Sequence, residues 1–173
     1  MPFKRPQELM FAQSMLFGLD HLYFKHTREL SVDDREHCNP LKRPTLFGFV
    51  IPDFQRGAVW SRDQQVALID SVWRAIPIGT YAVNLSYRKG NLPHLRNILI
   101  DGQQRLNALR AYWDDEFEYR GHVWSSLSTR DQRFFIAHSF PQMRTETHDE
   151  KQARAYYNAM NFGGTAHREE DRA

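Results

Sequence analysis

The stretch Asn97-Ile98-Leu99-Ile100-Asp101-Gly102-Gln103-Gln104-Arg105 joins a short apolar run to a glycine and a dense set of polar side chains. Its β-favouring run, residues 98–100, has no polar interruption, which favours a strand covered on both faces, although a buried helix gives the same pattern. After Gly102, apolar residues recur every three or four positions from Leu106 to Trp113, so a helix is expected to begin within residues 103–105. The stretch therefore predicts a strand, a glycine turn and the N-terminus of a helix.

The polar side chains of this turn are suited to binding an anion. The first turn of a helix carries free backbone N–H groups and partial positive charge, and a preceding glycine lets a phosphate approach the backbone closely. Arg105 adds a cation that can bind a phosphate through two hydrogen bonds. Asp101 could orient Mg²⁺ or a water molecule, and Gln103 and Gln104 could bind a phosphate or position a nucleophile. These residues alone leave two interpretations open, a phosphate site without a P-loop lysine, and a capped turn with a solvated arginine.

Three motifs in this chain, taken in order, resemble those of one bacterial and phage family. Residues 100–106 (IDGQQRL) resemble the signature of a family that includes the S part of GmrSD type IV restriction enzymes. Residues 51–56 (IPDFQR), closed by Trp60, resemble the family's IPxFQRxxxW segment, and residues 160–165 (MNFGGT) resemble its later N-x-G-G-T segment. The resemblance covers the chain from Val50 to Glu170. The family in turn resembles the ParB and sulfiredoxin nucleotide-binding fold.

The resemblance implies that the three motifs form one nucleotide site. The G-x-x-R turn of that fold corresponds to residues 102–105, which would hold phosphates. By chemical type, Asp101 would bind Mg²⁺ or Mn²⁺ or a water, and Gln103 and Gln104 would position phosphate or water, so these three and Arg105 are the expected catalytic residues. The expected nucleotide-binding residues are Gln55, Arg56, Gly102, Arg105, Asn161, Gly163, Gly164 and Thr165.

Two of these segments also have ordinary structural interpretations. Without the resemblance, Arg56 would be assigned to a surface turn and paired with a carboxylate. The glycines at 163 and 164 would be a plain helix C-cap. The match to the family motifs favours the site for both segments.

Length, composition and charge bound the remaining possibilities. The 173 residues, 41% hydrophobic and 25% charged, are typical of one folded domain with a proper core. A net charge of +2 gives no strong nucleic-acid signal, although 18 of the 23 basic residues are arginine, which favours phosphate and carboxylate forks. The single cysteine, Cys38, excludes an intramolecular disulfide and any multi-cysteine metal site. We expect the cytoplasm of a bacterial or phage-infected cell, with no membrane partner, since no apolar run reaches membrane-spanning length.

The predicted architecture is one compact α+β domain of the ParB/sulfiredoxin type, with a small mixed sheet and surrounding helices. Residues 1–45 are expected to be an N-terminal helical extension and arm, with a helical segment over 9–18, and residues 46–173 the DGQQR domain. We expect a stand-alone module, without the nuclease domain that follows this region in many relatives.

Other local signals place the surrounding elements. Ser61 can cap a helix that ends before Pro77. A strand over 81–87 should form a hairpin with the signature strand. The residues Thr147 to Glu150 have the spacing of a capping box, which predicts the start of the last helix. These elements would frame the site on both sides of the signature turn.

We weigh three functions for the predicted site. The first is hydrolysis of a nucleoside triphosphate with Mg²⁺, linked to phage or anti-phage DNA metabolism. The second is a DNA nuclease, as in the wider ParB-like superfamily, but the core motif has one convincing acidic residue, Asp101, whereas two-metal cleavage usually needs several. The third is a non-catalytic module that binds nucleotide or DNA to regulate a partner, such as a separate nuclease or other defence protein.

Overall fold

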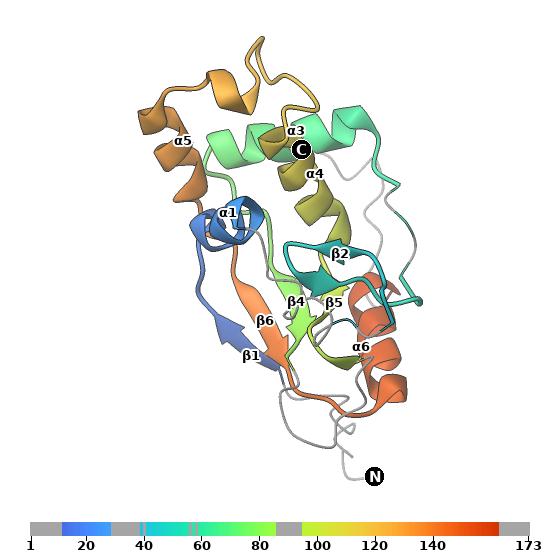
Figure 1. The fold of residues 1–173 in the computed structure, drawn as a ribbon. Coiled ribbons are helices and arrows are strands. Elements are labelled where there is room, and N and C mark those ends of the chain that lie inside the picture. Colours follow the sequence, from blue (N-terminus) through green and yellow to red (C-terminus); the bar gives the residue numbers. More distant parts are fainter. Residues whose placement is uncertain are drawn as a thin grey trace, which may run out of the picture.

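The sheet and helices of this α+β domain are described by a computed structural model for residues 12–28, 39, 41–55, 57, 59–85 and 95–162 (Figure 1). The strands of those residues are β1 (Ala12–Met15), β2 (Thr45–Leu46), β3 (Phe49–Val50), β4 (Tyr81–Asn84), β5 (Ile98–Asp101) and β6 (Gln142–Thr145). The helices are α1 (Leu19–Thr27), α3 (Arg62–Trp73), α4 (Gln103–Trp113), α5 (Thr129–Ile136) and α6 (Glu150–Phe162), with a short 3₁₀ helix η2 (Trp124–Ser126).

The strands form one mixed sheet in the order β1-β6-β4-β5-β3-β2. The signature strand β5 pairs antiparallel with β4, which confirms the expected pairing of these two segments, and it pairs parallel with β3 through Ile98 and Val50. On its other edge β4 pairs parallel with β6. The strand that leads into the signature turn therefore lies inside the sheet.

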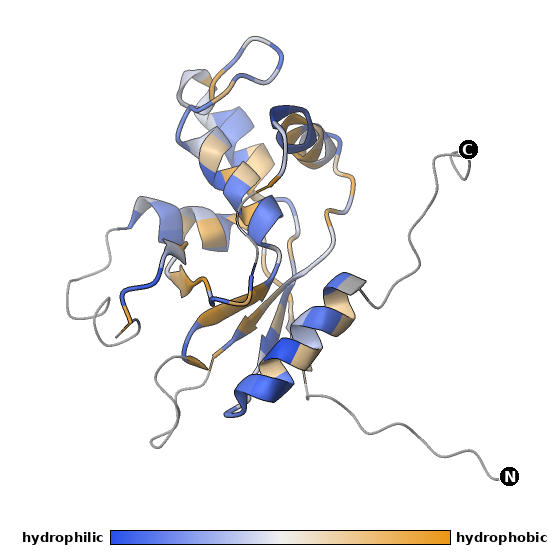
Figure 2. Cartoon of the chain, turned by 90° about the vertical axis from the view of Figure 1, so that its right-hand side faces the viewer, coloured by the Kyte–Doolittle hydropathy of each residue, from blue (hydrophilic) through white to orange (hydrophobic). Residues whose placement is uncertain are grey.

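Side chains of β5 alternate between two apolar clusters on opposite faces of the sheet. Leu99 packs into the larger cluster, with residues of α1, α3, α4 and α5, whereas Ile98 and Ile100 pack with Ala153 of α6. All three β5 side chains are fully buried, so the predicted strand with two covered faces is confirmed and the buried-helix alternative is wrong. Figures 1 and 2 show α6 on the opposite side of the sheet from the other helices.

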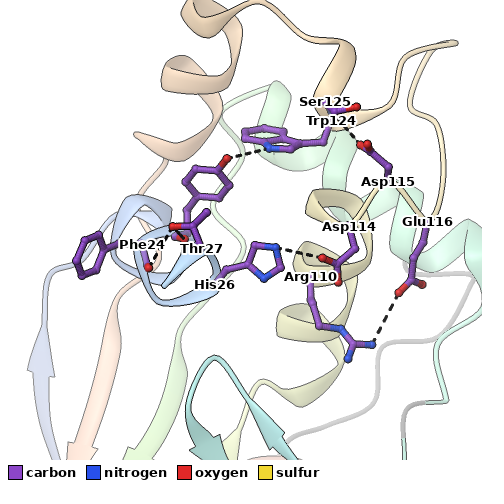
Figure 3. A network of polar contacts seen from close by, with 10 residues as sticks. Phe24, His26, Thr27, Arg110, Asp114, Asp115, Glu116, Trp124 and Ser125 are labelled. Atoms are coloured by element: carbon purple, nitrogen blue, oxygen red, sulfur yellow. Dashed lines mark hydrogen bonds and ion pairs between the residues drawn. The ribbon is translucent and has the colours of Figure 1, made fainter. Parts of the chain in front are cut away.

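The C-terminal end of α4 is packed among aromatic rings. Trp113 and Trp124 contact each other edge to face, and Tyr23 of α1 contacts both rings at centroid distances of 5.2 and 5.3 Å. The Trp124 indole donates to the Tyr23 hydroxyl at 3.2 Å, and His26 lies 3.2 Å from Asp114 (Figure 3). We call this region the aromatic end of α4.

Two predictions about the N-terminal part and the last helix are wrong. Residues 12–15, expected in a helix, form β1, because the edge of β6 offers a complete ladder from Ala12 opposite Thr145 to Met15 opposite Gln142. The last helix is capped by Asp149 rather than Thr147: Asp149 Oδ1 accepts from the Lys151 N–H at 2.8 Å. Thr147 is held on the sheet instead, since its N–H donates to Asn84 Oδ1.

The helix after residue 60 is confirmed with a shorter length than predicted. Ser61 and Gln64 form a capping box at its start. The helix ends at Trp73, since Ala75 adopts a left-handed conformation with φ of 57° and cannot continue it. The predicted division of the chain at residue 45 stays a prediction.

Candidate functional site

The signature turn has the predicted geometry of strand, glycine and helix. Gly102 has φ of 99°, and a Cβ at this position would lie 2.7 Å from the Tyr81 Cβ, so the turn requires glycine for both conformation and space. The first helical hydrogen bond runs from the Leu106 N–H to the Gly102 carbonyl at 2.9 Å. The backbone N–H groups of residues 103–105 therefore occupy the first turn of α4, where a helix has no internal acceptors for them.

Arg105 is held in place from two directions. Its Nη2 donates to Asp101 Oδ2 at 2.7 Å, one helical turn earlier, and its Nη1 donates to the carbonyl of Ile78 at 2.9 Å. Both charged side chains are mostly buried, with 21% of Arg105 and 18% of Asp101 exposed. The guanidinium also lies above the Phe140 ring. Gly79 beside it has a φ of 81°, which favours glycine, and a Cβ there would lie 2.7 Å from Arg105 Nη1. The arginine assigned to phosphate is thus an ion-pair partner of the aspartate assigned to metal.

Two glutamines of the predicted site are hydrogen-bonded to backbone. Gln104 joins α4 to the loop before α3: its Oε1 accepts from the N–H groups of Val59 and Trp60, and its Nε2 donates to the Gly57 carbonyl at 3.0 Å. Gln55 donates from Nε2 to the carbonyls of Leu99 and Ile100 on β5. The Gln55 bonds hold the segment that follows β3 against the signature strand, and the Gln104 bonds hold Gly57, Val59 and Trp60 against the start of α4.

Gln55, the signature turn and Asn161 line one cavity of about 160 Å³, which we call the turn pocket. Its lining residues are Gln55, Trp60, residues 100–105, Tyr157 and Asn161. Gln103 lines it, and its side chain makes no hydrogen bond to another described residue. The predicted site residues Arg56, Gly163, Gly164 and Thr165 lie outside the described residues. The part of the three-motif site that can be traced therefore converges as expected.

The turn pocket has a restricted set of charges. Asp101 is its single carboxylate and Arg105 its single cation among the lining residues that the structure describes. Tyr156 packs on the neighbouring face of α6; burial, and secondarily the negative charge of Asp101, raises the pKa of its hydroxyl. No group of three His, Cys, Asp or Glu side chains able to hold a metal occurs within the described ranges. A divalent cation would therefore have Asp101 as its one carboxylate ligand here.

Three contributors to the site were missed by the sequence analysis. Trp60 was identified only as the end of a motif, and Tyr157 only as part of a helix face, yet both line the turn pocket. The spacing of Tyr157 and Asn161, four residues apart on α6, could have indicated that they share a face. The Ile78 carbonyl could not have been found, because a backbone acceptor has no sequence signature.

One family model matches residues 39–172, which is most of the chain; its description is GmrSD restriction endonuclease, N-terminal domain. The chain belongs to this family. The recognition of a GmrSD-type domain is thereby confirmed, while the likeness of GmrSD domains to the ParB and sulfiredoxin fold stays a prediction. Neither the curated proteins nor the solved structures contain a match. Among its described helices, the GmrSD-type domain has none that is long and apolar enough to cross a bilayer.

Proposed function

We propose that this GmrSD-type domain binds a nucleoside triphosphate with Mg²⁺ or Mn²⁺ in the turn pocket and hydrolyses it as part of a DNA restriction system. The observation that carries the proposal is the convergence of Gln55, the Gly102 turn and Asn161 on one polar cavity at a helix N-terminus. Backbone donors and partial positive charge at such an end favour phosphate. The restriction setting follows from the family to which the chain belongs.

The size of the turn pocket suits phosphate groups rather than a whole nucleotide. Its volume of about 160 Å³ lies below the roughly 300–1,000 Å³ typical of small-molecule sites. The phosphates would lie against the N–H groups of residues 103–105, and the sugar and base would extend beyond the cavity. The first turn of α4 would therefore supply phosphate binding without selecting a base.

The bonds made by Arg105 are compatible with a phosphate role. A guanidinium has five N–H donors, and the bonds to Asp101 and Ile78 use two of them. These two bonds fix the orientation of the group before a ligand arrives, which lowers the entropy lost on binding. Arg105 would then share its charge between Asp101 and a phosphate oxygen.

The residues of the pocket fit a metal that is held chiefly by the nucleotide. Mg²⁺ is commonly bound through one or two carboxylates together with substrate phosphates and water. Asp101 would be its protein ligand, through the oxygen that Arg105 does not occupy. When bound, the metal would neutralise charge on the phosphates. Gln103, whose amide is uncommitted among the described residues, would orient the attacking water.

The non-catalytic alternative is favoured by a specific observation. Gln55, Gln104 and Arg105 all have backbone partners, so each already has a structural role. A domain of this kind would bind nucleotide to regulate a separate nuclease or other defence protein. The nuclease alternative is weaker, because Asp101 is the single acidic group among the described lining residues.

A nucleotide panel separates these functions. Thermal shift with and without Mg²⁺ would identify the nucleotide that binds, and product analysis would detect hydrolysis. Turnover supports our proposal, binding without turnover supports the regulatory module, and DNA nicking without nucleotide binding supports the nuclease.

Substituting Asp101 tests the metal role directly. Asp101→Asn should retain most nucleotide affinity but lose most Mg²⁺-dependent turnover, because an amide is a poorer ligand for a hard cation. Asp114→Asn, the same change at a carboxylate paired with His26 outside the pocket, is the matched control and should leave turnover unchanged. Equal turnover by Asp101→Asn and wild type would show that Asp101 only holds Arg105 in place.

A further inference from the structure

A second cavity, of about 340 Å³, lies where the end of α3 meets α4 and the segment that follows α4. Trp73, Tyr112, Tyr119 and Leu127 form its apolar wall, and the exposed Arg120 also lines it. We call it the aromatic cavity. It shares no lining residue with the turn pocket, and its volume lies within the roughly 300–1,000 Å³ typical of small-molecule sites.

Two rings that line the aromatic cavity stack nearly parallel to each other. Trp73 and Tyr119 have centroids 6.4 Å apart and planes only 6° apart. Tyr119 is fixed in this orientation, because its hydroxyl donates to Asp70 Oδ1 at 2.6 Å and Asp70 is itself paired with Arg74. Parallel aromatic faces favour a flat ring as ligand, since stacking gains dispersion and electrostatic energy without requiring a particular substituent pattern.

Two buried polar atoms of this cavity have no hydrogen-bond partner among the described residues. They are the Tyr112 hydroxyl, on a side chain that is fully buried, and the Trp73 indole nitrogen. Burial raises the pKa of Tyr112 and the nearby Trp73 indole partly offsets this rise, yet the two groups do not reach hydrogen-bond geometry with each other. A buried polar group without a partner is costly. A ligand ring that carries a nitrogen or carbonyl acceptor would supply the missing partner.

The charges around the aromatic cavity favour an anionic ligand. Asp70 and Arg74 largely neutralise each other at 2.7 Å. Arg120 has no described carboxylate within ion-pair distance, although its charge helps to lower the pKa of Asp70 and it interacts with the Tyr119 hydroxyl; its guanidinium carbon lies 5.5 Å from the centroid of the Tyr119 ring. A negative group attached to a ring stacked in the cavity would therefore find Arg120 beside it.

We infer that the aromatic cavity binds the base of a nucleotide, stacked against Trp73 and Tyr119, with the phosphate beside Arg120. This site is additional to the turn pocket and does not depend on hydrolysis there. The same chemistry is present in a free nucleotide and in a base of a single-stranded DNA, so the test includes both.

Binding would be measured on the full chain in buffer without divalent metal. One arm titrates nucleoside 5′-monophosphates by calorimetry, and the other follows the fluorescence anisotropy of a short labelled single-stranded DNA. Arg120→Gln removes the cation at an exposed position, and Leu127→Trp fills the cavity. Arg130→Gln, on the exposed surface of α5 away from the cavity, is the matched control.

Arg120→Gln and Leu127→Trp should each weaken binding about tenfold, while Arg130→Gln should bind like wild type. If Leu127→Trp does not fold, as judged by its thermal melt, Arg120→Gln alone decides. If binding is seen in just one of the two arms, that arm shows whether the ligand is a free nucleotide or a base of single-stranded DNA. Equal affinity of Arg120→Gln and wild type in both arms, or no binding in either arm, would overturn the inference.

Discussion

The two ends of helix α4 are held in place by different interactions. At its N-terminus, Gln104 and Arg105 donate to backbone carbonyls of neighbouring loops, and the cavity beside them is polar. At its C-terminus, Trp113 lies among the rings of Tyr23, Phe47 and Trp124. The same helix therefore has one end fixed by directed hydrogen bonds and the other fixed by apolar burial.

Because of this difference, substitutions at the two ends of α4 should affect different properties, the stability of the domain at one end and the geometry of the turn pocket at the other. Apolar burial stabilises in proportion to the area removed from water, so large rings contribute several kcal/mol each, while a single hydrogen bond contributes about 1 kcal/mol net. Substitutions at the aromatic end should lower the stability of the whole domain. Substitutions at the N-terminal end should change the turn pocket more than the stability.

The largest effect is expected for Trp124→Ala. Trp124 is 3% exposed and contacts Tyr112, Trp113 and Phe135, so its removal should lower the free energy of unfolding by about 3–5 kcal/mol in urea denaturation. Leu16→Ala, at a side chain that is 84% exposed, is the control and should change it by less than about 0.5 kcal/mol. A loss below about 1 kcal/mol for Trp124→Ala would remove the contrast between the two ends.

Substituting Gly102 should have the largest effect at the N-terminal end. Alanine at position 102 would have to adopt a φ of 99°, and its Cβ would clash with the Tyr81 side chain. Gly102→Ala should therefore lower the free energy of unfolding by about 2–3 kcal/mol and weaken nucleotide binding. Gly121→Ala has a positive φ but open space, and should cost about 1 kcal/mol. Gly57→Ala has neither constraint and should be near neutral. Equal losses for Gly102→Ala and Gly121→Ala would show that close packing on Tyr81 is unimportant.

Arg105→Ala should affect binding more than stability. The loss of the Asp101 and Ile78 partners should cost about 1–2 kcal/mol of unfolding free energy, with the ion pair weakened by its partial exposure. The loss of a charged donor to phosphate should weaken nucleotide binding by about tenfold or more. Arg105→Lys should restore binding only in part, because lysine lacks the planar fork. Unchanged affinity of Arg105→Ala for every nucleotide that the parent binds would exclude the phosphate role.

Much of the region around α4 could be predicted because its signals are local. The apolar run of β5, the glycine turn and the helical spacing after it all lie within the signature stretch, and the Ser61 cap lies beside its own helix. Strand β1 could not be predicted in this way, since its structure depends on pairing with β6 far along the chain. Local propensity does not contain that information.

The convergence of Gln55, the signature turn and Asn161 on one cavity could be predicted from the sequence, but the bonds that these residues make could not. The predicted roles of Asp101 and Arg105 are separate, although their spacing of four residues allows the ion pair that the structure forms. The predicted role of Gln104 is to position phosphate or water. The partners of Gln104 are backbone groups of Gly57, Val59 and Trp60, and no side-chain pattern identifies such acceptors and donors.

The smallest and most discriminating effect is expected between the neighbouring residues Gln103 and Gln104. Gln104→Ala removes three hydrogen bonds to Gly57, Val59 and Trp60; two of these bonds are exposed, so water can replace them, and the free energy of unfolding should fall by only about 1 kcal/mol. Gln103→Ala removes none to a described residue, so its stability should stay within about 0.5 kcal/mol of wild type. Denaturation in urea and nucleotide turnover would be measured for both. If Gln103 orients water, Gln103→Ala should lose most turnover at unchanged stability, because Gln103 lines the turn pocket and its side chain bonds to no described residue. Loss of turnover in Gln104→Ala alone would instead mean that the loop at residues 57–60, rather than the amide at 103, determines the reaction.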